Sequence, residues 1–312
     1  MNLLVTGASG FLGRNLLLRA PAHWRIVALY NGDTRFPEFV AGLKRPNIIP
    51  AQCDLASTPD VVRFTQTHGT EWDSCLYLAG KVDIPWSVRE PKGDLLANTT
   101  PVLNLLDLIR VEKLVYFSSG AVYDGHVGEV GPDVPVAPTL PYAISKLASE
   151  HYVRFFHQRR HSVAKYLIVR FFGAYGPYEA EHKIYTKLIR TLGIERQDHY
   201  PIYGDGTNLI DAMYVDDAVE AVRRILNGDH WNLTINLAGG HPRRIDDLVH
   251  AVGAALGVGS VTIHRNSVAN ERNEFWGSVR EMQELFEFRP GVDLAEGISR
   301  FRDFLARDTG AR

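Results

Sequence analysis

Cysteine is scarce in this chain of 312 residues: Cys53 and Cys75 are the two present, and both lie in apolar, strand-like segments. They have no CxxC spacing and no nearby histidine pair, which predicts buried free thiols rather than a disulfide or a metal site. The twelve histidines are scattered without the spacing of metal ligands, so we predict no bound metal.

A strong charge bias and long apolar runs are also lacking. Lys and Arg number 34, Asp and Glu number 36, and no basic run is present that would follow a nucleic-acid backbone. No segment approaches the roughly 20 apolar residues that span a bilayer, and the first residues, "MNLLVTGASG", do not have the pattern of a signal peptide. The composition therefore argues against nucleic acid and membrane partners and favours a cytoplasmic location.

Short runs of Val, Ile, Leu and Tyr alternate with longer helical patterns from "NLLVTG" to "AKYLIVRFF". Continuous apolar runs suit strands that are buried on both faces, and strands that alternate with helices predict right-handed crossovers in a parallel sheet. We therefore predict an α/β fold with a Rossmann-type, doubly wound parallel sheet over residues 1–170. After residue 170 the alternation of strand-like and helical segments becomes less regular. We expect residues 171–312 to form a smaller, interdigitated substrate-binding lobe, with segments near 209–237 returning to the first domain.

A glycine-rich turn, "VTGASGFLG", directly follows the first expected strand and opens the first expected helix. Glycine permits the tight turn and lets the backbone approach a pyrophosphate, while the helix N-terminus supplies free N–H groups and partial positive charge. This context predicts a dinucleotide-binding turn, to which we assign Gly7, Gly10, Phe11, Leu12 and Gly13.

Tyr30 ends the second expected strand, where a unit that binds NAD usually has an acidic residue for the ribose hydroxyls. Without that carboxylate a 2′-phosphate is not repelled. Arg35 could reach such a phosphate, although a loop arginine can equally be just solvated. The sequence therefore favours NADP over NAD by a narrow margin.

Tyr142 and Lys146 stand four residues apart in "PYAISKLASE", so they share one face of the expected helix. A free phenol has a pKa of about 10, and a neighbouring ammonium with a positively charged nicotinamide would lower that pKa and favour acid/base catalysis. The segment "FSSGAVYDG" (117–125) ends an expected strand, at the edge where ligands bind in open α/β sheets. These two segments together predict a reactive tyrosine rather than a surface pair.

These segments resemble the extended short-chain dehydrogenase/reductase family, which contains nucleotide-sugar epimerases, dehydratases and reductases. The resemblance covers almost the whole chain and includes "CDL" (53–55), "YLAGKVDIPWSVREP" (77–91), "RFFGAYGP" (170–177), "IYGDGTNLIDAMYVDDAVEAV" (202–222) and "INLAGG" (235–240). It implies that Ser119 hydrogen-bonds the reacting sugar oxygen. Tyr142 would be the acid/base, and Lys146 would bind the nicotinamide ribose and tune the tyrosine.

The resemblance also implies further contacts. Those with the cofactor are Asp54, Leu55, Ala79, Gly80 and Asn98, and those with the substrate are Lys81, Trp86 and Gly173. It implies a homodimer packed through the helices near 95–110 and 142–159.

The chain departs from the family at several positions. Gly120 and Ala121 stand where dehydratases of the family have two acidic residues, which argues against dehydration and decarboxylation. Gly173 replaces a more usual asparagine, and Ile210 replaces an arginine that clamps the nucleotide diphosphate in many members. Arg272 is then the candidate for holding a diphosphate, with an ordinary surface arginine as the equal alternative.

The resemblance implies an NAD(P)-dependent oxidoreductase that transfers a hydride at C4 of a nucleotide-activated sugar. A 4-ketoreductase is narrowly favoured because Tyr30 replaces the acid, and a 4-epimerase with tightly bound NAD shares the same three catalytic residues. A non-catalytic regulator that senses dinucleotides is the third alternative. The intact Ser119, Tyr142 and Lys146 argue against it.

Overall fold

The computed structural model describes residues 1–266 and 273–309, and its chain clusters into two compact units. The first unit comprises Met1–Gly125, Pro132–Phe171 and Val222–Asn236, and the second comprises His126–Gly131, Phe172–Ala221 and Leu237–Arg312. Both units are therefore discontinuous in the sequence. The helix α9 (Val215–Asn227) contributes to both.

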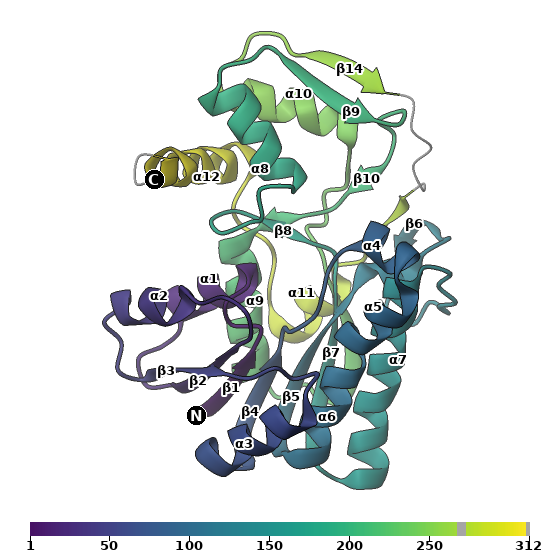
Figure 1. Ribbon diagram of the computed structural model, residues 1–312. Coiled ribbons are helices and arrows are strands. Elements are labelled where there is room, and N and C mark those ends of the chain that lie inside the picture. Colours follow the sequence, from purple (N-terminus) through teal and green to yellow (C-terminus); the bar gives the residue numbers. More distant parts are fainter. Residues whose placement is uncertain (267–272, 310–312) are drawn as a thin grey trace. The chain divides into compact units, whose positions relative to one another are not determined.

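The first unit is built on a seven-stranded sheet in the described part of the chain, with the order β12-β7-β5-β4-β1-β2-β3 (Figure 1). Each neighbouring pair from β3 to β7 is parallel. The strands are β1 (Asn2–Thr6), β2 (Arg25–Tyr30), β3 (Ile48–Gln52), β4 (Glu71–Tyr77), β5 (Arg110–Ser119), β7 (Val163–Phe171) and β12 (Leu233–Leu237). Their central residues are buried, as continuous apolar runs predict, and the Rossmann-type fold is confirmed.

Helices follow the strands as crossovers, and several begin at sequence signals. Pro141 stands at the first turn of α7, where its fixed φ suits a helix start, and Ser57 caps α3 by accepting a hydrogen bond from the N–H of Asp60. The helices are α1 (Phe11–Arg19), α2 (Phe36–Gly42), α3 (Thr58–His68), α4 (Ile84–Arg89), α5 (Pro91–Asn98), α6 (Thr100–Leu108) and α7 (Pro141–Phe155). Short turns η1 (Gly120–Tyr123) and η2 (Phe156–Arg160) follow β5 and α7.

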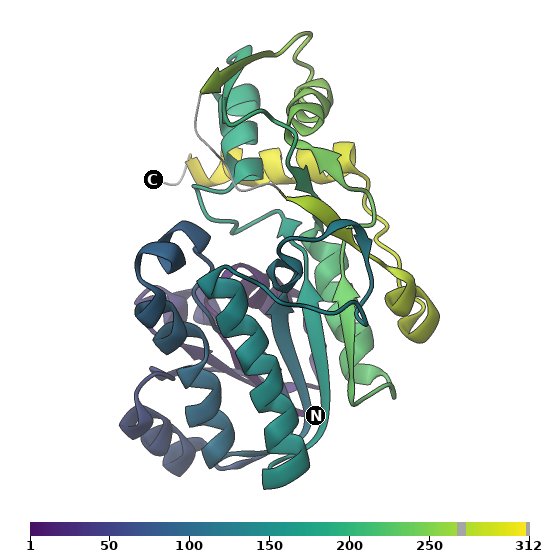
Figure 2. The same cartoon turned by 90° about the vertical axis from the view of Figure 1, so that its right-hand side faces the viewer.

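One face of the sheet is covered by α3, α6 and α7, which stand together in front of the strands in Figure 2. Side chains of these helices and of the strands β1 to β5 and β7 form one apolar cluster, which includes Val61, Leu105 and Val153. Cys53 and Cys75 lie in this cluster as buried free thiols, as expected. The crossovers therefore present the carboxyl ends of the strands at one edge of the sheet.

The second unit has small, separate pairs of strands around a second apolar cluster. β9 pairs with β14, β6 with β15, β8 with β11 and β10 with β13. The strands are β6 (Val127–Val130), β8 (Ala174–Tyr175), β9 (His199–Tyr203), β10 (Leu209–Ile210), β11 (Met213–Tyr214), β13 (Arg243–Arg244), β14 (Thr262–Asn266) and β15 (Glu274–Gly277). The helices are α8 (Ile184–Leu188), η3 (Ile189–Ile194), α10 (Ile245–Ala255), α11 (Arg280–Phe286) and α12 (Leu294–Thr309).

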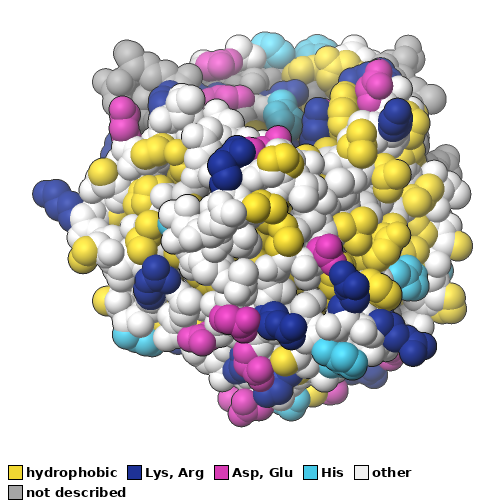
Figure 3. Space-filling view, turned by 60° about the horizontal axis from the view of Figure 1, so that its bottom comes forward, with side chains coloured by type: hydrophobic (Ala, Val, Ile, Leu, Met, Phe, Trp, Pro, Cys, Tyr) yellow, Lys and Arg dark blue, Asp and Glu magenta, His cyan; other side chains and the backbone are white. Residues whose placement is uncertain are grey.

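The charged side chains alternate in sign on the face shown in Figure 3, where acidic and basic groups lie interspersed. Within residues 1–266 and 273–309, no helix has both the length and the hydrophobicity that crossing a lipid bilayer requires.

Candidate active site

The glycine turn joins β1 to α1 and has no room for larger residues. Gly7 has a φ of +65°, and a Cβ added there would lie 2.9 Å from the backbone nitrogen of Ala79. A Cβ on Gly13 would lie 2.5 Å from the backbone oxygen of Ala8. Gly10 precedes α1 as its N-cap residue and has no side chain to cap the helix. The N–H groups of the first turn are thus available to an anion.

A cavity of about 510 Å³ opens beside this turn, at the carboxyl ends of β1 to β4. Eight of the predicted site residues line it: Gly7, Gly10, Tyr30, Asp54, Leu55, Ala79, Gly80 and Lys81. Phe11, Leu12, Gly13, Arg35 and Asn98 are not among its lining residues. Apolar walls with a few polar groups and a glycine turn at one end suit a dinucleotide.

The loop after β2 contains an ion pair that the sequence did not suggest. Arg14, from α1, forms an ion pair with Asp33, with 2.5 Å between Nη2 and Oδ2. The Arg14 guanidinium also lies 4.5 Å from the ring centroid of Phe39. Asp33 also accepts a hydrogen bond from the backbone N–H of Arg35. A carboxylate is therefore held in the loop that Tyr30 begins, three residues later than expected.

Tyr142 and Lys146 lie on the buried face of α7 and are 4% and 5% exposed. The backbone N–H of Tyr142 donates to Ser87 Oγ. The side chain of Tyr142 forms a hydrogen bond with the side chain of Ser119, at the end of β5. Lys146 Nζ donates to the backbone oxygen of Phe117 at 2.6 Å and lies 4.5 Å from the ring centroid of Tyr116. The structure thus brings the three predicted catalytic residues to the same strand end.

Burial dominates the electrostatics of the Tyr142–Lys146 pair. Burial raises the pKa of Tyr142 to about 12, which the hydrogen bond with Ser119 opposes and the charge of Asp94 reinforces. Burial also lowers the pKa of Lys146 to about 8, against the charges of Glu150 and Asp94. Desolvation dominates the pKa of Tyr142, and the Lys146 ammonium is directed to the Phe117 oxygen. The lower pKa expected for Tyr142 included the charge of a nicotinamide, so that expectation stays a prediction.

Behind the pair, Glu150 and Arg170 form a buried salt bridge. Arg170 Nε and Nη2 donate to the two oxygens of Glu150 at 3.1 and 2.9 Å, and Ser118 Oγ donates to the same carboxylate at 2.6 Å. Both carboxylate oxygens are thus satisfied, as a buried charge requires. This pair fixes α7 against β5 and β7.

Asn98 connects α5 to the loop that follows β4. Its Oδ1 accepts from the backbone N–H of Lys81 at 2.9 Å, and its Nδ2 donates to the Lys81 oxygen at 3.2 Å and to Asp94 Oδ1 at 2.8 Å. Lys81 Nζ in turn lies 3.4 Å from the ring centroid of Trp86. Asn98 thus acts on the cavity wall through the backbone rather than by lining it.

Gly173 and Ile210 belong to the second unit. Gly173 has a φ of +140°, which favours glycine there and accounts for the absence of an asparagine. Ile210 pairs with Arg243 across the two-stranded β10–β13 ribbon, and directly opposed residues of antiparallel strands share a face. Arg272 lies outside the described residues.

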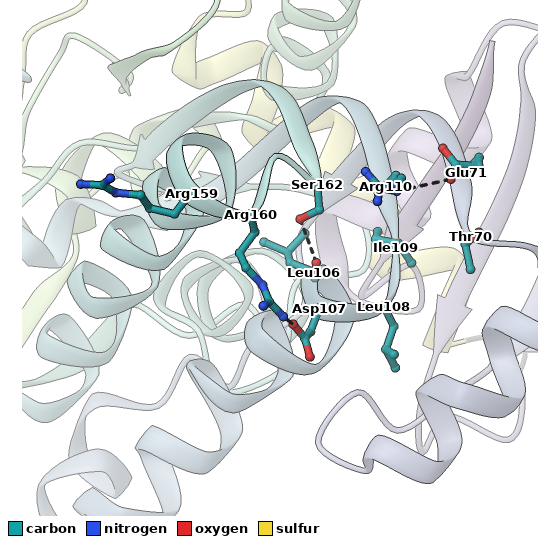
Figure 4. A pocket seen from close by; sticks show the side chains of 10 residues that line it. All are labelled: Thr70, Glu71, Leu106, Asp107, Leu108, Ile109, Arg110, Arg159, Arg160 and Ser162. Carbon is teal, nitrogen blue, oxygen red and sulfur yellow. Dashed lines mark hydrogen bonds and ion pairs between the residues drawn. The ribbon is translucent and has the colours of Figure 1, made fainter.

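A second cavity, of about 540 Å³, lies at the opposite edge of the sheet, at the amino ends of β4, β5 and β7. Figure 4 shows Arg160 turned toward Asp107, Arg110 turned toward Glu71, and Arg159 directed away. Its ion pairs neutralise one another and it is remote from the strand ends where ligands bind in this fold, so we assign it no catalytic role. Across the described ranges, no group of three His, Cys, Asp or Glu side chains is arranged to hold a metal ion.

Sequence reasoning missed two residues that hydrogen-bond predicted site residues: Asp33 and Asp94. Asp94 stands four residues before Asn98, the spacing of a helical side-chain pair, and this signal was available. Asp33 is recognised only from its ion pair with Arg14 of α1.

A seven-stranded Rossmann-type sheet with a glycine turn at its first crossover is a dinucleotide-binding fold. Residues 3–238 match the NAD dependent epimerase/dehydratase family. The chain is 30% identical to a dTDP-glucose 4,6-dehydratase of Xanthomonas campestris pv. campestris over 275 residues, which cover 81% of this chain and 75% of the relative.

Solved structures show the same fold. UDP-glucuronic acid 4-epimerase from Bacillus cereus, in complex with UDP-glucuronic acid and NAD, is 24% identical with a TM-score of 0.86, covering 98% of this chain and 99% of that one. MoeE5, in complex with UDP-glucose and NAD, is 25% identical with a TM-score of 0.83, covering 99% and 100%. The chain belongs to the NAD dependent epimerase/dehydratase family, which comprises nucleotide-sugar enzymes, and the resemblance to extended short-chain dehydrogenases/reductases is confirmed.

Proposed function

We propose that this protein is a nucleotide-sugar 4-epimerase that uses bound NAD. The observation that carries the proposal is the buried arrangement of Ser119, Tyr142 and Lys146 at the end of β5, in the same unit as a glycine-lined cavity. Family membership supports the substrate class and the cofactor. Hydride transfer at C4 of the sugar is the reaction that these groups support best.

The first unit fits a dinucleotide because Gly7 and Gly13 leave no room for a Cβ beside the N-terminus of α1. The pyrophosphate would be held by that helix start, and the adenosine by Asp54 and Leu55. The earlier preference for NADP rested on the missing acid at Tyr30. Asp33 restores a carboxylate to this loop and neutralises Arg14, so a 2′-phosphate would meet a paired cation and a negative charge, which favours NAD.

Tyr142 holds its proton at neutral pH, because burial raises its pKa to about 12. Bound NAD would supply the hydride acceptor and a positive charge that favours the phenolate of Tyr142, which is the form that can accept a proton. Tyr142 then takes the proton of the sugar hydroxyl, while Ser119 hydrogen-bonds the sugar oxygen. Epimerisation would be complete once C4 of the rotated ketosugar has received the hydride back on its opposite face and Tyr142 has returned its proton to the carbonyl oxygen.

Dehydration is not favoured, although a curated relative carries that name. Elimination of water from a sugar needs an acid and a base beyond the hydride-transfer groups. Gly120 and Ala121 begin η1 where dehydratases of the family carry these acids, and neither can transfer a proton.

A 4-ketoreductase is the second candidate. Tyr142 with a raised pKa is suited to giving a proton to a ketone, and Tyr30 leaves the end of β2 without an acid. A regulator without activity is disfavoured, because a buried lysine directed to a strand end costs desolvation energy and has no use there.

Arg243 is the residue that we propose for the substrate diphosphate. Arg243 lies directly across the β10–β13 ribbon from Ile210. Its guanidinium is therefore on the same face of the ribbon as the Ile210 side chain, which has no charged group. A guanidinium binds phosphate oxygens in a bidentate manner. Lys81 and Trp86 are the proposed contacts of the first unit with the sugar.

We further propose a cytoplasmic homodimer. Exposed apolar side chains gather on the two neighbouring helices α5 and α7: Leu95, Leu96, Ile144, Tyr152 and Phe155. Such a surface suits a partner helix pair. Light scattering should show a dimer for the wild type and a monomer for an Ile144→Glu, Phe155→Glu double variant.

The decisive experiment has two parts. Acid-released cofactor from the purified protein is identified by chromatography, and the protein is incubated with UDP-, dTDP- and GDP-hexoses, whose products are analysed by NMR. We expect NAD to be released and C4 epimers to interconvert without net consumption of cofactor. An empty protein that binds NADPH and reduces a 4-ketosugar would instead establish the reductase.

A further inference from the structure

Asp94 is a buried carboxylate that the proposed reaction leaves unused. Its side chain is 0% exposed in α5, and its Oδ1 accepts from Asn98 Nδ2 at 2.8 Å. Its Oδ2 has no hydrogen-bond partner among the described residues. A buried charge without full satisfaction is costly, so its retention suggests a role other than stability.

Asp94 orients Asn98, which in turn holds the backbone that lines the cavity. A carboxylate only accepts hydrogen bonds, so it turns the NH₂ group of Asn98 toward itself and the Asn98 carbonyl toward Lys81. The backbone of Gly80 passes so close that a Cβ there would lie 2.9 Å from Asn98 Oδ1. The orientation of one amide therefore fixes the backbone at Gly80 and Lys81, and both residues line the cavity.

Asp94 also acts on the reactive pair through its charge. α5 packs against α7, and the charge of Asp94 raises the pKa of both Tyr142 and Lys146. The other groups that act on Lys146 are Glu150 on its own helix and, from β5, the ring of Tyr116 and the Phe117 oxygen.

Glu150 is already bound on both oxygens by Arg170. Among the carboxylates that act on Lys146, Asp94 is thus the one whose charge is not already balanced by an arginine.

We propose that Asp94 is a positioning residue that, through Asn98, holds the cofactor-lining backbone in place and serves as the counter-charge of Lys146 on the neighbouring helix. The inference rests on the proposed function, because it gives a role to the lysine beside the catalytic tyrosine. Its two effects separate by chemistry, since an asparagine at position 94 still offers an oxygen to Asn98 but carries no charge.

Three variants test the separation. Asp94→Asn should lower the pKa of Lys146 and move the alkaline limb of the pH–turnover profile down by about one unit, the size of a neighbouring-charge effect, with cofactor affinity unchanged. Asn98→Ala should weaken cofactor binding about tenfold, for the loss of hydrogen bonds to the loop, with the limb unmoved. Asp94→Ala should show both effects.

The pKa of Lys146 is also followed by NMR of labelled lysine side chains, with a Lys146→Met variant assigning the signal. This readout needs no turnover, so it distinguishes a failure of this inference from a failure of the proposed function. If Asp94→Asn leaves the lysine titration unchanged, Asp94 is not its counter-charge. If Asn98→Ala binds the cofactor normally, the link to the cavity wall is wrong.

Discussion

Replacing Tyr142 with phenylalanine removes one hydroxyl from a side chain that is 4% exposed and leaves the packing of its ring intact. The hydroxyl's hydrogen bond with Ser119 is lost, which should cost about 1 kcal/mol of folding free energy. Ser119 Oγ still accepts from the N–H of Ala121 at 3.1 Å, so it is not left without a partner. Turnover should nevertheless fall at least about a hundredfold, because the proton donor is gone.

Tyr123→Phe is the matched control in the same unit. Tyr123 is fully buried, and its hydroxyl donates to Asn236 Oδ1 at 2.8 Å and accepts from Arg170 Nη1 at 3.0 Å. Losing these two bonds, one of them to a charged group, should cost about 2 kcal/mol while turnover stays near the wild-type value.

Thermal unfolding and the rate of C4 epimer interconversion are measured for both tyrosine variants. The control should therefore be the less stable protein and the more active one. Activity of Tyr142→Phe within a few-fold of wild type would remove Tyr142 from the mechanism. Equal losses of activity in both variants would mean that stability, not chemistry, explains the effect.

The remaining predictions concern the glycine turn, a buried glutamate and the arginine proposed to bind the substrate diphosphate. Gly13→Ala should weaken cofactor binding measured by calorimetry and cost about 1–3 kcal/mol of stability, because its Cβ meets backbone at 2.5 Å. Burial raises the pKa of Glu179 from 4.5 to about 7, so between these pH values the folded protein binds more protons than the unfolded protein. The free energy of unfolding therefore falls as the pH rises from 5 to 7. Glu179→Gln should abolish that fall, at most about 3 kcal/mol, in thermal unfolding. Arg243→Ala should weaken binding of nucleoside diphosphates about ten- to a hundredfold.

Each of these predictions has its own control or contrary result. Gly42→Ala, at the end of α2 and outside the cavity lining, should leave cofactor binding unaffected, since an added Cβ meets nothing within 4 Å. A pH dependence that persists in Glu179→Gln would assign it to another group. Arg244 lies on the opposite face of the ribbon from Arg243, so Arg244→Ala should bind nucleoside diphosphates like the wild type, and equal losses would indicate a nonspecific charge effect.

The sheet of the first unit was predictable because its strands are apolar runs bounded by turn residues, and burial on both faces requires that pattern. Two local motifs, the glycine turn and the helical spacing of Tyr142 and Lys146, were enough to place reactive groups at one strand edge. The strand β6 was not predictable. It has four residues and pairs in parallel with β15, far along the chain, so no local pattern reveals its partner.

The electrostatics of the site were also beyond the sequence. Spacing put Lys146 on the face of Tyr142, but which oxygen its ammonium would bind depends on β5, and the Phe117 carbonyl is that oxygen. Likewise, the sequence did not reveal a cation beside Ile210, because the strand register that pairs Ile210 with Arg243 arises only on folding.

The helix α9 and the strand β12 have a consequence for how the protein is made. Residues 222–236 belong to the first unit, yet the ribosome adds them only after residues 172–221 of the second unit. Domains generally fold as units, N-terminal parts first, as the chain emerges. Here the sheet lacks its β12 edge, next to β7, until residue 237 has been added. The nascent first unit therefore has an unpaired strand edge during that interval, which is an aggregation hazard that a continuous domain of the same size would not face.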